Sequence, residues 1–447
     1  MTALTLTIVI VFCIGYFLIA VESVTKINKA AIALLMLVAT WSLFMLAPSD
    51  YLPAAAGGQI SSVVGETFER HLGSTSITLF FLMGAMTIVE LVDQNGGFNF
   101  VRDVMHTHSK RRLLWRIAFM TFFLSAILDN LTTSIVMIMV LRKLVSERKD
   151  RIIYASLIVI AANSGGAFSP IGDVTTIMLW NKGVISALGI ICTLLIPSVV
   201  SMVIPAYVLS RSLKGVLTFS ADHTQAVQTS SLTASQRRVI FFLGVGGLIF
   251  VPIFKSITHL PPVVGILLVL SVLWIVTEVF YAHLKKPEEK GSMQKRVAQM
   301  LSRIDMSTIL FFLGILMAVA CLETIGVLAM LGKGLNTAFG GNHYVTTGII
   351  GMLSSIVDNV PLVAGCMGMY PVAALGDMAV DGIFWQLLAY CAGVGGSMLI
   401  IGSAAGIVVM GLEKISFGWY MKNISWIALL GYLSGILCYW LEKIFIL

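Results

Sequence analysis

Long apolar runs alternate with short polar stretches along almost the whole chain. Eight of these runs are close to the ~20 residues that an α-helix needs to cross about 30 Å of hydrocarbon. They lie at about 4–24, 28–48, 74–93, 184–210, 238–258, 262–283, 306–330 and 420–446. The pattern therefore predicts eight uninterrupted membrane-spanning helices.

Two longer apolar runs, at about 152–182 and 384–413, contain clusters of small residues. Glycine weakens a helix, and proline lacks the backbone donor that a helix interior requires. We therefore expect each run to be a broken helix. The clusters are Asn163-Ser164-Gly165-Gly166-Ala-Phe-Ser-Pro170-Ile-Gly172-Asp173 in the first run, and Gly393-Val-Gly395-Gly396-Ser397 followed by Gly402-Ser403-Ala-Ala-Gly406 in the second.

Two further apolar runs, at about 113–145 and 346–375, are each interrupted by an Asp-Asn pair that begins at Asp129 or Asp358. The longest of their four arms covers only about 24 Å at 1.5 Å per residue. Such arms fit a re-entrant hairpin, which returns to the side it started from, better than a complete crossing.

Composition agrees with a membrane protein. Hydrophobic residues make up 58% of the 447 residues and charged residues only 11%, against roughly 25% charged in ordinary globular proteins. The net charge of +7 comes from basic residues in short stretches between apolar runs, which is typical of membrane orientation rather than nucleic-acid binding. The six cysteines lie singly, without metal-binding spacing, so we expect no metal cofactor.

Basic residues mark the cytoplasmic side of a membrane protein. If the N-terminus lies outside and each hairpin returns to its own side, every basic cluster faces the cytoplasm. This layout predicts ten crossings and two hairpins, with both termini outside and an uncharged first helix that is retained. The clusters are Lys26 with Lys29, 102–112, 142–151, 211–238, 285–303 and Lys414 with Lys422.

The chain repeats itself at a shift of about 230 residues. Ser125-x3-Asp129-Asn130 falls on Ser354-x3-Asp358-Asn359, and Gly165-Gly166 falls on Gly395-Gly396. Five crossings per copy is an odd number, so the second copy enters the membrane inverted, and paired broken segments in inverted repeats indicate a secondary transporter.

The predicted fold is therefore an all-α polytopic membrane protein with two inverted-topology repeats, each with five transmembrane helices plus one re-entrant hairpin. The first repeat spans 1–210, with scaffold helices in 4–93, the hairpin 113–145, the broken helix 152–182 and the helix 184–210. A cytoplasmic linker covers 211–237. The second repeat spans 238–447, with scaffold helices in 238–330, the hairpin 346–375, the broken helix 384–413 and the helix 420–446.

Three acidic residues, Asp129, Asp173 and Asp358, lie at the predicted helix breaks. A carboxylate at bilayer depth costs about 2.5–3.5 kcal/mol on insertion scales, which favours a functional role. Hairpins that enter from opposite faces would bring Asp129 and Asp358 to the midplane beside the broken helices. Carboxylates confined there favour either a bound cation or a proton.

Hydroxyl, amide and carboxylate oxygens, which hard cations prefer, surround these positions in the sequence. We predict a cation and proton site, with Na⁺ at Asp129, Asp173 and Asp358. The candidate residues are Asp129, Asn130, Thr132, Thr133, Ser164, Asp173, Thr175 and Thr176 in the first half, and Ser354, Ser355, Asp358, Asn359, Ser397 and Ser403 in the second.

Structural explanations compete with this interpretation. Asp129 and Asp358 could only cap the helices that follow them, and the threonines could only bond to their own helices. The glycine pairs could be helix-packing contacts. Asp173 is the hardest to explain this way, because its counterpart in the second repeat is Ser403 and no structural role demands a charge.

The motifs are similar to those of the NhaD-type sodium/proton antiporters. The resemblance rests on Ser125-Ala-Ile-Leu-Asp129-Asn130-Leu-Thr132-Thr133, on Asn163-Ser164-Gly165-Gly166-x3-Pro170-x-Gly172-Asp173-Val-Thr175-Thr176, and on Ser354-x3-Asp358-Asn359-Val-Pro361-Leu362. These antiporters belong to the ion transporter superfamily, together with arsenite permeases and divalent anion/sodium symporters.

The resemblance implies a homodimer in the cell inner membrane, with three scaffold helices in each half and a mobile unit that moves in elevator fashion. It implies efflux of Na⁺ or Li⁺ driven by proton entry, with no cofactor. The dicarboxylate relatives have uncharged Ser-Asn-Thr at both hairpin tips, whereas this chain has Asp129 and Asp358, which favour a cation.

Other functions remain open at this point. An anion or arsenite permease on the same fold is the main alternative. An intramembrane aspartyl protease would need only two carboxylates, such as Asp129 and Asp173, and would leave the duplication ending in Asp358 without a purpose. A membrane scaffold that transports nothing would leave the charges of Asp129, Asp173 and Asp358 without a function.

Overall fold

The computed structural model describes residues 2–20, 25, 27–52, 60–97, 105, 107, 109–213, 215, 232–282, 304–356 and 358–445. Most of the expected linker 211–237 and all of the basic stretch 285–303 lie outside the described residues. Within these ranges, six helices are long and apolar enough to cross a membrane, and six shorter apolar helices accompany them.

Helices account for nearly all of the described chain. The first half contains α1 (Ala3–Ala20), α3 (Lys29–Phe44), the short 3-10 helix η1 (Pro48–Asp50), α4 (Ile60–Gln94), α6 (Lys110–Leu128), α7 (Asn130–Leu144), α8 (Arg148–Ala167), α9 (Val174–Lys182) and α10 (Ala187–Ser212). The second half contains α11 (Ala234–Thr258), α12 (Pro262–Ala282), α15 (Met306–Thr324), α16 (Val327–Ala338), α17 (His343–Leu353), α18 (Asn359–Met369), α19 (Ile383–Gly395), α20 (Ala404–Glu413), α21 (Phe417–Asn423) and α22 (Ser425–Phe445).

Two expected helices have different ends in the structure. The helix α4 begins at Ile60 rather than near 74 and has 35 residues, about 52 Å at 1.5 Å per residue. Charged residues in its first turns hide this extension from a hydropathy pattern, although they do not prevent a helix. The run 306–330 is not one span, because the chain turns at Gly326, whose left-handed φ of 76° separates α15 from α16.

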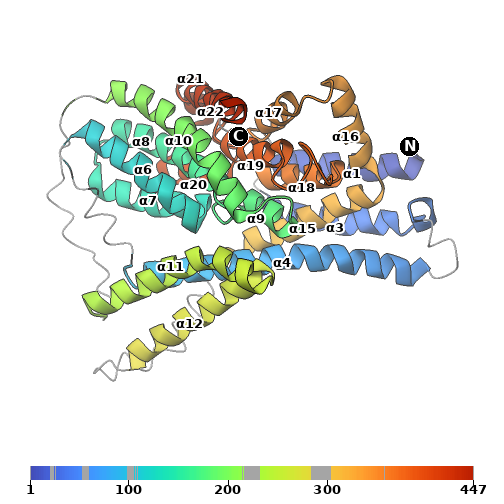
Figure 1. Ribbon diagram of the computed structural model, residues 1–447, viewed down its shortest axis with the longest axis horizontal. Helices are drawn as coiled ribbons and strands as arrows, with labels where there is room; N and C mark the ends of the chain where they lie inside the picture. The colour runs from blue at the N-terminus through green and yellow to red at the C-terminus, as the bar shows by residue number, and fades with distance from the viewer. Residues whose placement is uncertain are drawn as a thin grey trace.

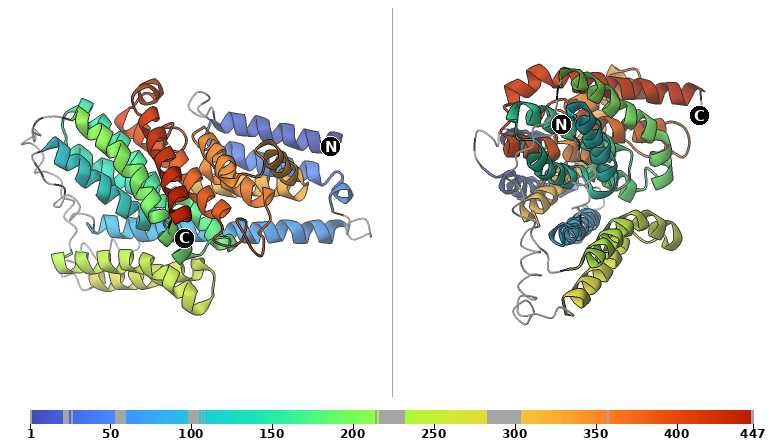
Figure 2. Two further views of the ribbon diagram at one scale, coloured as in Figure 1. Left: turned by 45° about the horizontal axis from the view of Figure 1, so that its top comes forward. Right: turned by 90° about the vertical axis from the view of Figure 1, so that its left-hand side faces the viewer.

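The helices form two groups. We call α1, α3, α4, α11, α12 and α15 the frame helices, because they pack chiefly on one another. The helices α6 to α10 and α17 to α22 form the central bundle, in which α8 contacts α6, α7, α10, α19 and α20. Figures 1 and 2 show α11 and α12 standing apart from the central bundle, with α4 beside them.

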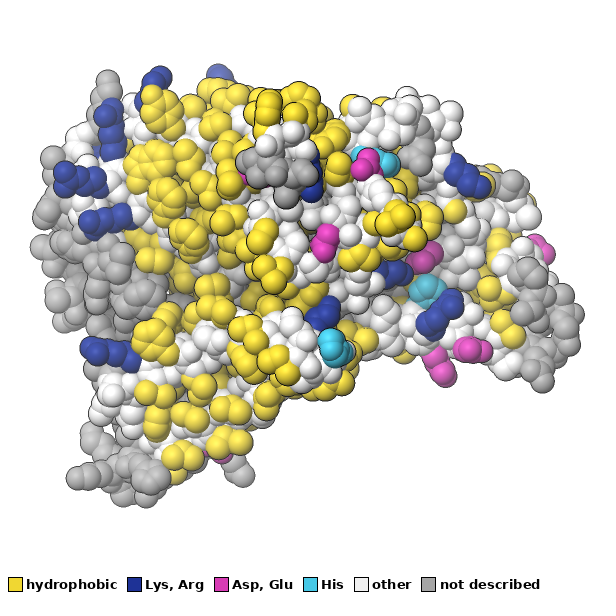
Figure 3. Space-filling model, viewed as in Figure 1, with side chains coloured by type: hydrophobic (Ala, Val, Ile, Leu, Met, Phe, Trp, Pro, Cys, Tyr) yellow, Lys and Arg dark blue, Asp and Glu magenta, His cyan; other side chains and the backbone are white. Residues whose placement is uncertain are grey.

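The outer surface is strongly apolar. Large side chains such as Leu188 and Phe242 are 75% and 69% exposed, and yellow side chains cover much of the face in Figure 3. Several Lys and Arg side chains gather along the left-hand edge of this view. An apolar band of this extent with charges at its margin fits a lipid environment.

Paired glycines allow close helix contacts in the central bundle. A Cβ atom on Gly165 of α8 would overlap the carbonyl oxygen of Phe122 in α6, and a Cβ atom on Gly395 of α19 would overlap the carbonyl oxygen of Gly351 in α17. Beside these contacts, the hydroxyl of Ser125 donates to the carbonyl of Ala162 at 2.6 Å. The small residues of the two halves therefore make matching contacts.

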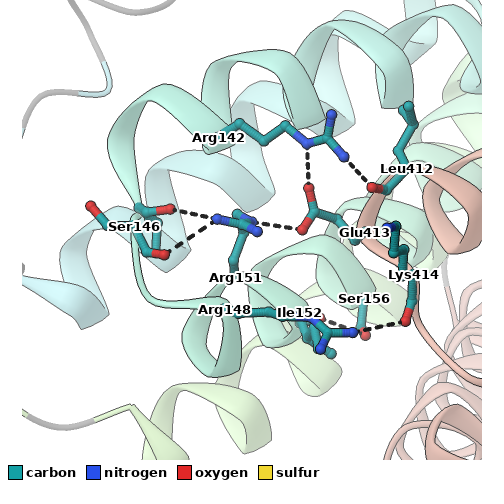
Figure 4. A network of polar contacts seen from close by, with 10 residues as sticks. Arg142, Ser146, Arg148, Arg151, Ile152, Ser156, Leu412, Glu413 and Lys414 are labelled. Atoms are coloured by element: carbon teal, nitrogen blue, oxygen red, sulfur yellow. Dashed lines mark hydrogen bonds and ion pairs between the residues drawn. The ribbon is translucent and has the colours of Figure 1, made fainter. Parts of the chain in front are cut away.

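A network of charges ties the two halves of the bundle together (Figure 4). The Glu413 side chain, which has no exposed area, accepts from Arg142 at 2.7 Å and from Arg151 at 2.6 Å. Arg148 also donates to the carbonyl of Lys414 at 3.1 Å. Because α7 and α8 come from the first half and α20 from the second, this contact holds the two halves in register.

We expect Gly165→Ala to lower the midpoint of thermal unfolding in detergent, because the added Cβ pushes α8 away from Phe122. The cost of such overpacking is about 1–3 kcal/mol. The control Gly73→Ala places its Cβ in open space on α4 and is expected to be neutral or slightly stabilising. Equal midpoints for the two variants would show that α6 and α8 do not need this close approach.

We expect Glu413→Gln to lower the free energy of unfolding by about 3 kcal/mol, the lower end for a broken buried ion pair, because Arg142 and Arg151 lose their shared carboxylate. Glu147→Gln is the matched control, since the Glu147 side chain is 56% exposed and pairs with Lys110 at 3.5 Å; its effect should stay below about 1 kcal/mol. Chemical denaturation of both variants in the same detergent measures the difference. Equal losses would contradict a special role for Glu413.

Candidate functional site

Each of the three acidic residues at the helix breaks caps the helix that follows it. Asp129 accepts from the backbone N–H of Thr132 at 2.8 Å, and Asp358 accepts from that of Val360 at 3.3 Å. Asp173 accepts from the backbone N–H of Thr175 at 2.9 Å. Ser403 caps α20 in the same way, so capping explains an oxygen at these positions but does not require a charge.

Asp173 lies at the centre of the site and is 1% exposed. Its Oδ2 accepts from the amide of Asn130 at 2.6 Å, and the amide of Asn359 lies 3.4 and 3.3 Å from Oδ1 and Oδ2. Asn130 begins α7 and Asn359 begins α18. One buried carboxylate therefore receives donors from the break of each Asp-Asn pair, and Thr175 adds its hydroxyl at 3.0 Å.

Asn163 on α8 extends this network to the second broken helix. Its Oδ1 accepts from Asn130 at 3.1 Å, and its amide nitrogen donates to Ser397 at 2.9 Å and to Ser403 at 3.0 Å. Asn163 lies in the predicted break but is not among the predicted site residues. The signal that could identify it is an amide side chain inside an apolar run, directly before Ser164.

The other two acidic residues differ in their surroundings. Both oxygens of Asp129 are taken by Thr132, whose hydroxyl donates to Oδ2 at 2.9 Å. Asp358 instead faces Lys29 of α3, with 3.8 Å between Nζ and Oδ2. Asp129 and Asp358 directly precede Asn130 and Asn359, the two residues whose amides contact Asp173, so the three acidic residues belong to one part of the central bundle.

Several predicted site residues make contacts away from the Asp173 carboxylate, although the Thr176 hydroxyl donates to the backbone carbonyl of Asp173 at 2.8 Å. The Ser164 hydroxyl accepts from Ser201 on α10 at 2.9 Å. Ser354 donates to the carbonyl of Ala392, while Ser355 and Thr176 donate to carbonyls within four residues of themselves. The Thr133 hydroxyl is buried and has no hydrogen-bond partner among the described residues.

The acidic side chains do not surround a single point. Among the described residues, no group of three or more His, Cys, Asp or Glu side chains is arranged to hold one metal ion. The groups that contact the Asp173 carboxylate are the amide N–H groups of Asn130 and Asn359 and the hydroxyl of Thr175. Asn163 accepts from Asn130 and donates to Ser397 and Ser403, which extends this polar network. Amide and hydroxyl groups carry the kind of neutral oxygen that hard cations prefer.

A cavity of about 470 Å³ opens between the frame helices and the central bundle. Its walls are parts of α4, α15, α9 and α18, and thus include the helices that begin at Asp173 and Asn359. Four ionisable side chains line it: Arg70, His71, Lys182 and Glu323. The cavity is therefore polar and lies beside the parts of α9 and α18 that follow their first turns.

The fold is shared with a solved transporter. The YdaH transporter of Alcanivorax borkumensis superposes with a TM-score of 0.56, covering 88% of this chain and 90% of that chain at 13% sequence identity. At this identity the similarity concerns the fold alone. With its apolar helices, broken helices and buried polar centre, the chain is a multi-pass membrane protein with a transporter fold.

A family model described as citrate transporter (CitMHS) matches residues 16–387, and the chain belongs to this family. Sodium/proton antiporter 1 of Arabidopsis thaliana is 43% identical over 96% of this chain and 71% of its own length. Sodium/proton antiporter 2 of the same plant is 40% identical, over 96% and 98%. The Na⁺/H⁺ antiporter NhaD of Vibrio cholerae is 29% identical, over 96% and 89%.

These comparisons confirm the resemblance to NhaD-type antiporters. They also exclude the intramembrane protease, because the family and the named relatives are transporters and not enzymes. The geometry agrees, since Asp173 is hydrogen-bonded to Asn130, Asn359 and Thr175 and, within the described part of the chain, not to Asp129.

We expect Asn163→Ala to lower the free energy of unfolding by about 1–2 kcal/mol, because Ser397 and Ser403 lose their shared donor. Asn423→Ala is the control, since Asn423 is exposed and donates only to a carbonyl of its own helix region; its effect should stay within about 0.5 kcal/mol. Thermal unfolding in detergent compares the two. Wild-type stability of Asn163→Ala would contradict a bridging role.

Proposed function

We propose that this protein exchanges Na⁺ or Li⁺ for H⁺ across a membrane, with cation and proton competing for the carboxylates around Asp173. The observation that carries the proposal is the convergence of Asn130 and Asn359 on the buried carboxylate of Asp173. The names of the curated relatives agree with it. We place the protein in the cell inner membrane, as the resemblance to NhaD-type antiporters implies.

A cation would find suitable ligands without large movement. The amides of Asn130 and Asn359 present N–H groups to the ionised carboxylate, and rotation of either amide presents its oxygen instead. The unpartnered hydroxyl of Thr133 and the hydroxyl of Thr175 are further oxygen ligands. Asp129, Asp173 and Asp358 would supply the negative charge, with Asp173 as the inner ligand.

Competition with protons follows from burial. An ionised carboxylate in a low-dielectric site is costly unless a cation, a donor or a proton compensates it. When the site faces a proton-rich side, protonation displaces the cation. When it faces the other side, the carboxylates ionise and bind the cation again. The same site then couples the two fluxes.

Two inverted repeats, 1–210 and 238–447, with re-entrant hairpins at α6–α7 and α17–α18, explain how both tips reach one site. Matching contacts support the duplication: Ser125 donates to the Ala162 carbonyl at 2.6 Å, and Ser354 donates to the Ala392 carbonyl at 2.7 Å. We place both termini outside, and the linker 211–237 in the cytoplasm.

An elevator motion suits the two groups of helices. The frame helices would stay fixed, in a homodimer as in the resembling antiporters, while the hairpins and broken helices of the central bundle slide past them. The salt bridges of Glu413 with Arg142 and Arg151 support movement of the two halves as one body. The 470 Å³ cavity at the interface between the groups is the access path from one side.

Citrate or another anion is the second candidate, because the family model carries the description citrate transporter. The basic residues Arg70 and Lys182 in the cavity would attract an anion. The carboxylates of Asp129, Asp173 and Asp358 would repel it at the centre of the site, so a cation is the better fit.

We expect Asp129→Asn, Asp173→Asn and Asp358→Asn each to abolish Na⁺-induced pH changes in everted vesicles, because each removes a charge that a cation or proton needs. Asp50→Asn is the matched control, because Asp50 is exposed in η1. Its exchange should equal that of the wild type. Normal exchange in any one of the three variants would remove that residue from the core site.

Counterflow in reconstituted vesicles separates the two candidate cargoes. Preloaded Na⁺ or Li⁺ should accelerate uptake of labelled Na⁺, whereas citrate and arsenite should have no effect. Uptake of citrate without any response to Na⁺ would overturn the antiport proposal and favour the anion permease.

A further inference from the structure

An ion pair links a frame helix to the tip of the second Asp-Asn break. Lys29 is the first residue of α3, and its Nζ lies 3.8 Å from Oδ2 of Asp358. The two side chains are only 20% and 16% exposed. Lys29 is one of the basic residues expected to mark the cytoplasmic side, and no signal in the sequence pairs it with a residue more than three hundred positions away.

The surroundings fix the position of the Lys29 ammonium. Asn28 caps α3 through the N–H of Ala30 at 2.8 Å and donates to Ser307 of α15 at 2.9 Å. The ammonium also lies 4.4 Å from the centre of the Phe311 ring, a favourable cation–π contact. The start of α3 is therefore anchored on α15, which holds the lysine beside Asp358.

The acidic residue of the first break has no such partner. Thr132 occupies both oxygens of Asp129, and Asp129 forms no ion pair within the described part of the chain. Asp358 uses Oδ1 to cap α18 and turns Oδ2 to Lys29. Among the described residues, a basic side chain of a frame helix, Lys29, therefore pairs with the acidic residue of only one of the two Asp-Asn breaks.

We propose that Lys29 is a positioning residue that acts as an internal counter-ion at the site, an inference that rests on the proposed cation exchange. Its ammonium neutralises Asp358 while no cation is bound. An arriving cation shares the carboxylate neighbourhood of Asp358 and Asp173, repels the ammonium across a poorly hydrated space, and must displace it.

Displacement has a mechanical consequence. Lys29 belongs to a frame helix, whereas Asp358 begins α18 of the central bundle, so the ion pair fastens the two groups to each other. A bound cation weakens this link and frees the tip of the second break from α3. The same event therefore satisfies the charge of the site and releases the element that carries it.

The test is a cation-binding titration that does not depend on transport. Purified full-length protein in detergent, at an alkaline pH where carboxylates are ionised, is heated at increasing Na⁺ concentrations, because a bound ligand raises the unfolding midpoint. Lys29→Gln removes the competitor and should lower the half-saturating Na⁺ concentration at least about fivefold, the lower end of ordinary coupling between two ligands. Lys333→Gln removes the same charge from an exposed site on α16 and should leave the value unchanged.

Lys29→Arg provides the opposite arm. Arginine keeps the charge and holds a carboxylate at least as firmly as lysine, so its half-saturating Na⁺ concentration should equal or exceed that of the wild type. A purely structural role for Lys29 would lower the midpoint without Na⁺ and leave the half-saturating concentration unchanged in Lys29→Gln, which overturns the inference.

If Lys29→Gln does not fold, Lys29→Met and Lys29→Arg decide the matter. A half-saturating concentration below the wild-type value in Lys29→Arg, or at or above it in Lys29→Met, would overturn the inference. Failure of the proposed function looks different: the wild type itself would show no stabilisation by any alkali cation.

Discussion

The structure depends on the cost of an ionised carboxylate in a place that water does not reach. Asp173 is almost completely buried, and its charge is compensated by donors from Asn130 and Asn359 rather than by a basic side chain. Those donors lie at the first turns of α7 and α18. These helices pack on α8 and α19, which make close backbone contacts at Gly165 and Gly395. The compensation of one charge therefore links three chain segments that are separated in sequence.

The close contacts at Gly165 and Gly395 follow from the same requirement. Short helices bring their free ends together only if their backbones approach closely, and a side chain at either glycine would overlap a carbonyl oxygen. Ser125 and Ser354 then bond across the closest points. Small residues at these places allow the helices to pack closely, while the amide and carboxylate side chains next to them form the polar network around Asp173. These two roles explain why small and polar residues alternate along the breaks.

Much of the fold could be predicted from the sequence, because a helix that crosses lipid needs a long run of apolar residues, and such runs are visible in the sequence. The hydropathy pattern does not predict the beginning of α4 at Ile60, since Glu66, Glu69 and Arg70 end a hydropathy signal without ending a helix. The turn at Gly326 was missed because the apolar run continues through it. Asp173, Asn130 and Asn359 were placed together by the repeat, whereas Asn163 and Lys29 depend on tertiary contacts that no local pattern records.

The candidate residues also separate in a way that composition does not foresee. The predicted site includes serines and threonines because their hydroxyl oxygens can bind a cation. In the structure, however, the hydroxyls of Ser164, Ser354 and Ser355 form hydrogen bonds with neighbouring helices or with their own helix region. A hydroxyl can bond to a nearby carbonyl wherever one is free, so sequence alone does not tell a ligand from a packing contact. Amides and carboxylates inside apolar runs have fewer local partners, and they were the better guide.

The position that follows each broken stretch differs between the halves, with Asp173 in one and Ser403 in the other. Both side chains cap their helices with nearly the same backbone angles. The local backbone therefore accepts either residue, and the cap alone does not select an acid. The consequence is a charge at one of the two broken stretches and a neutral hydroxyl at the other.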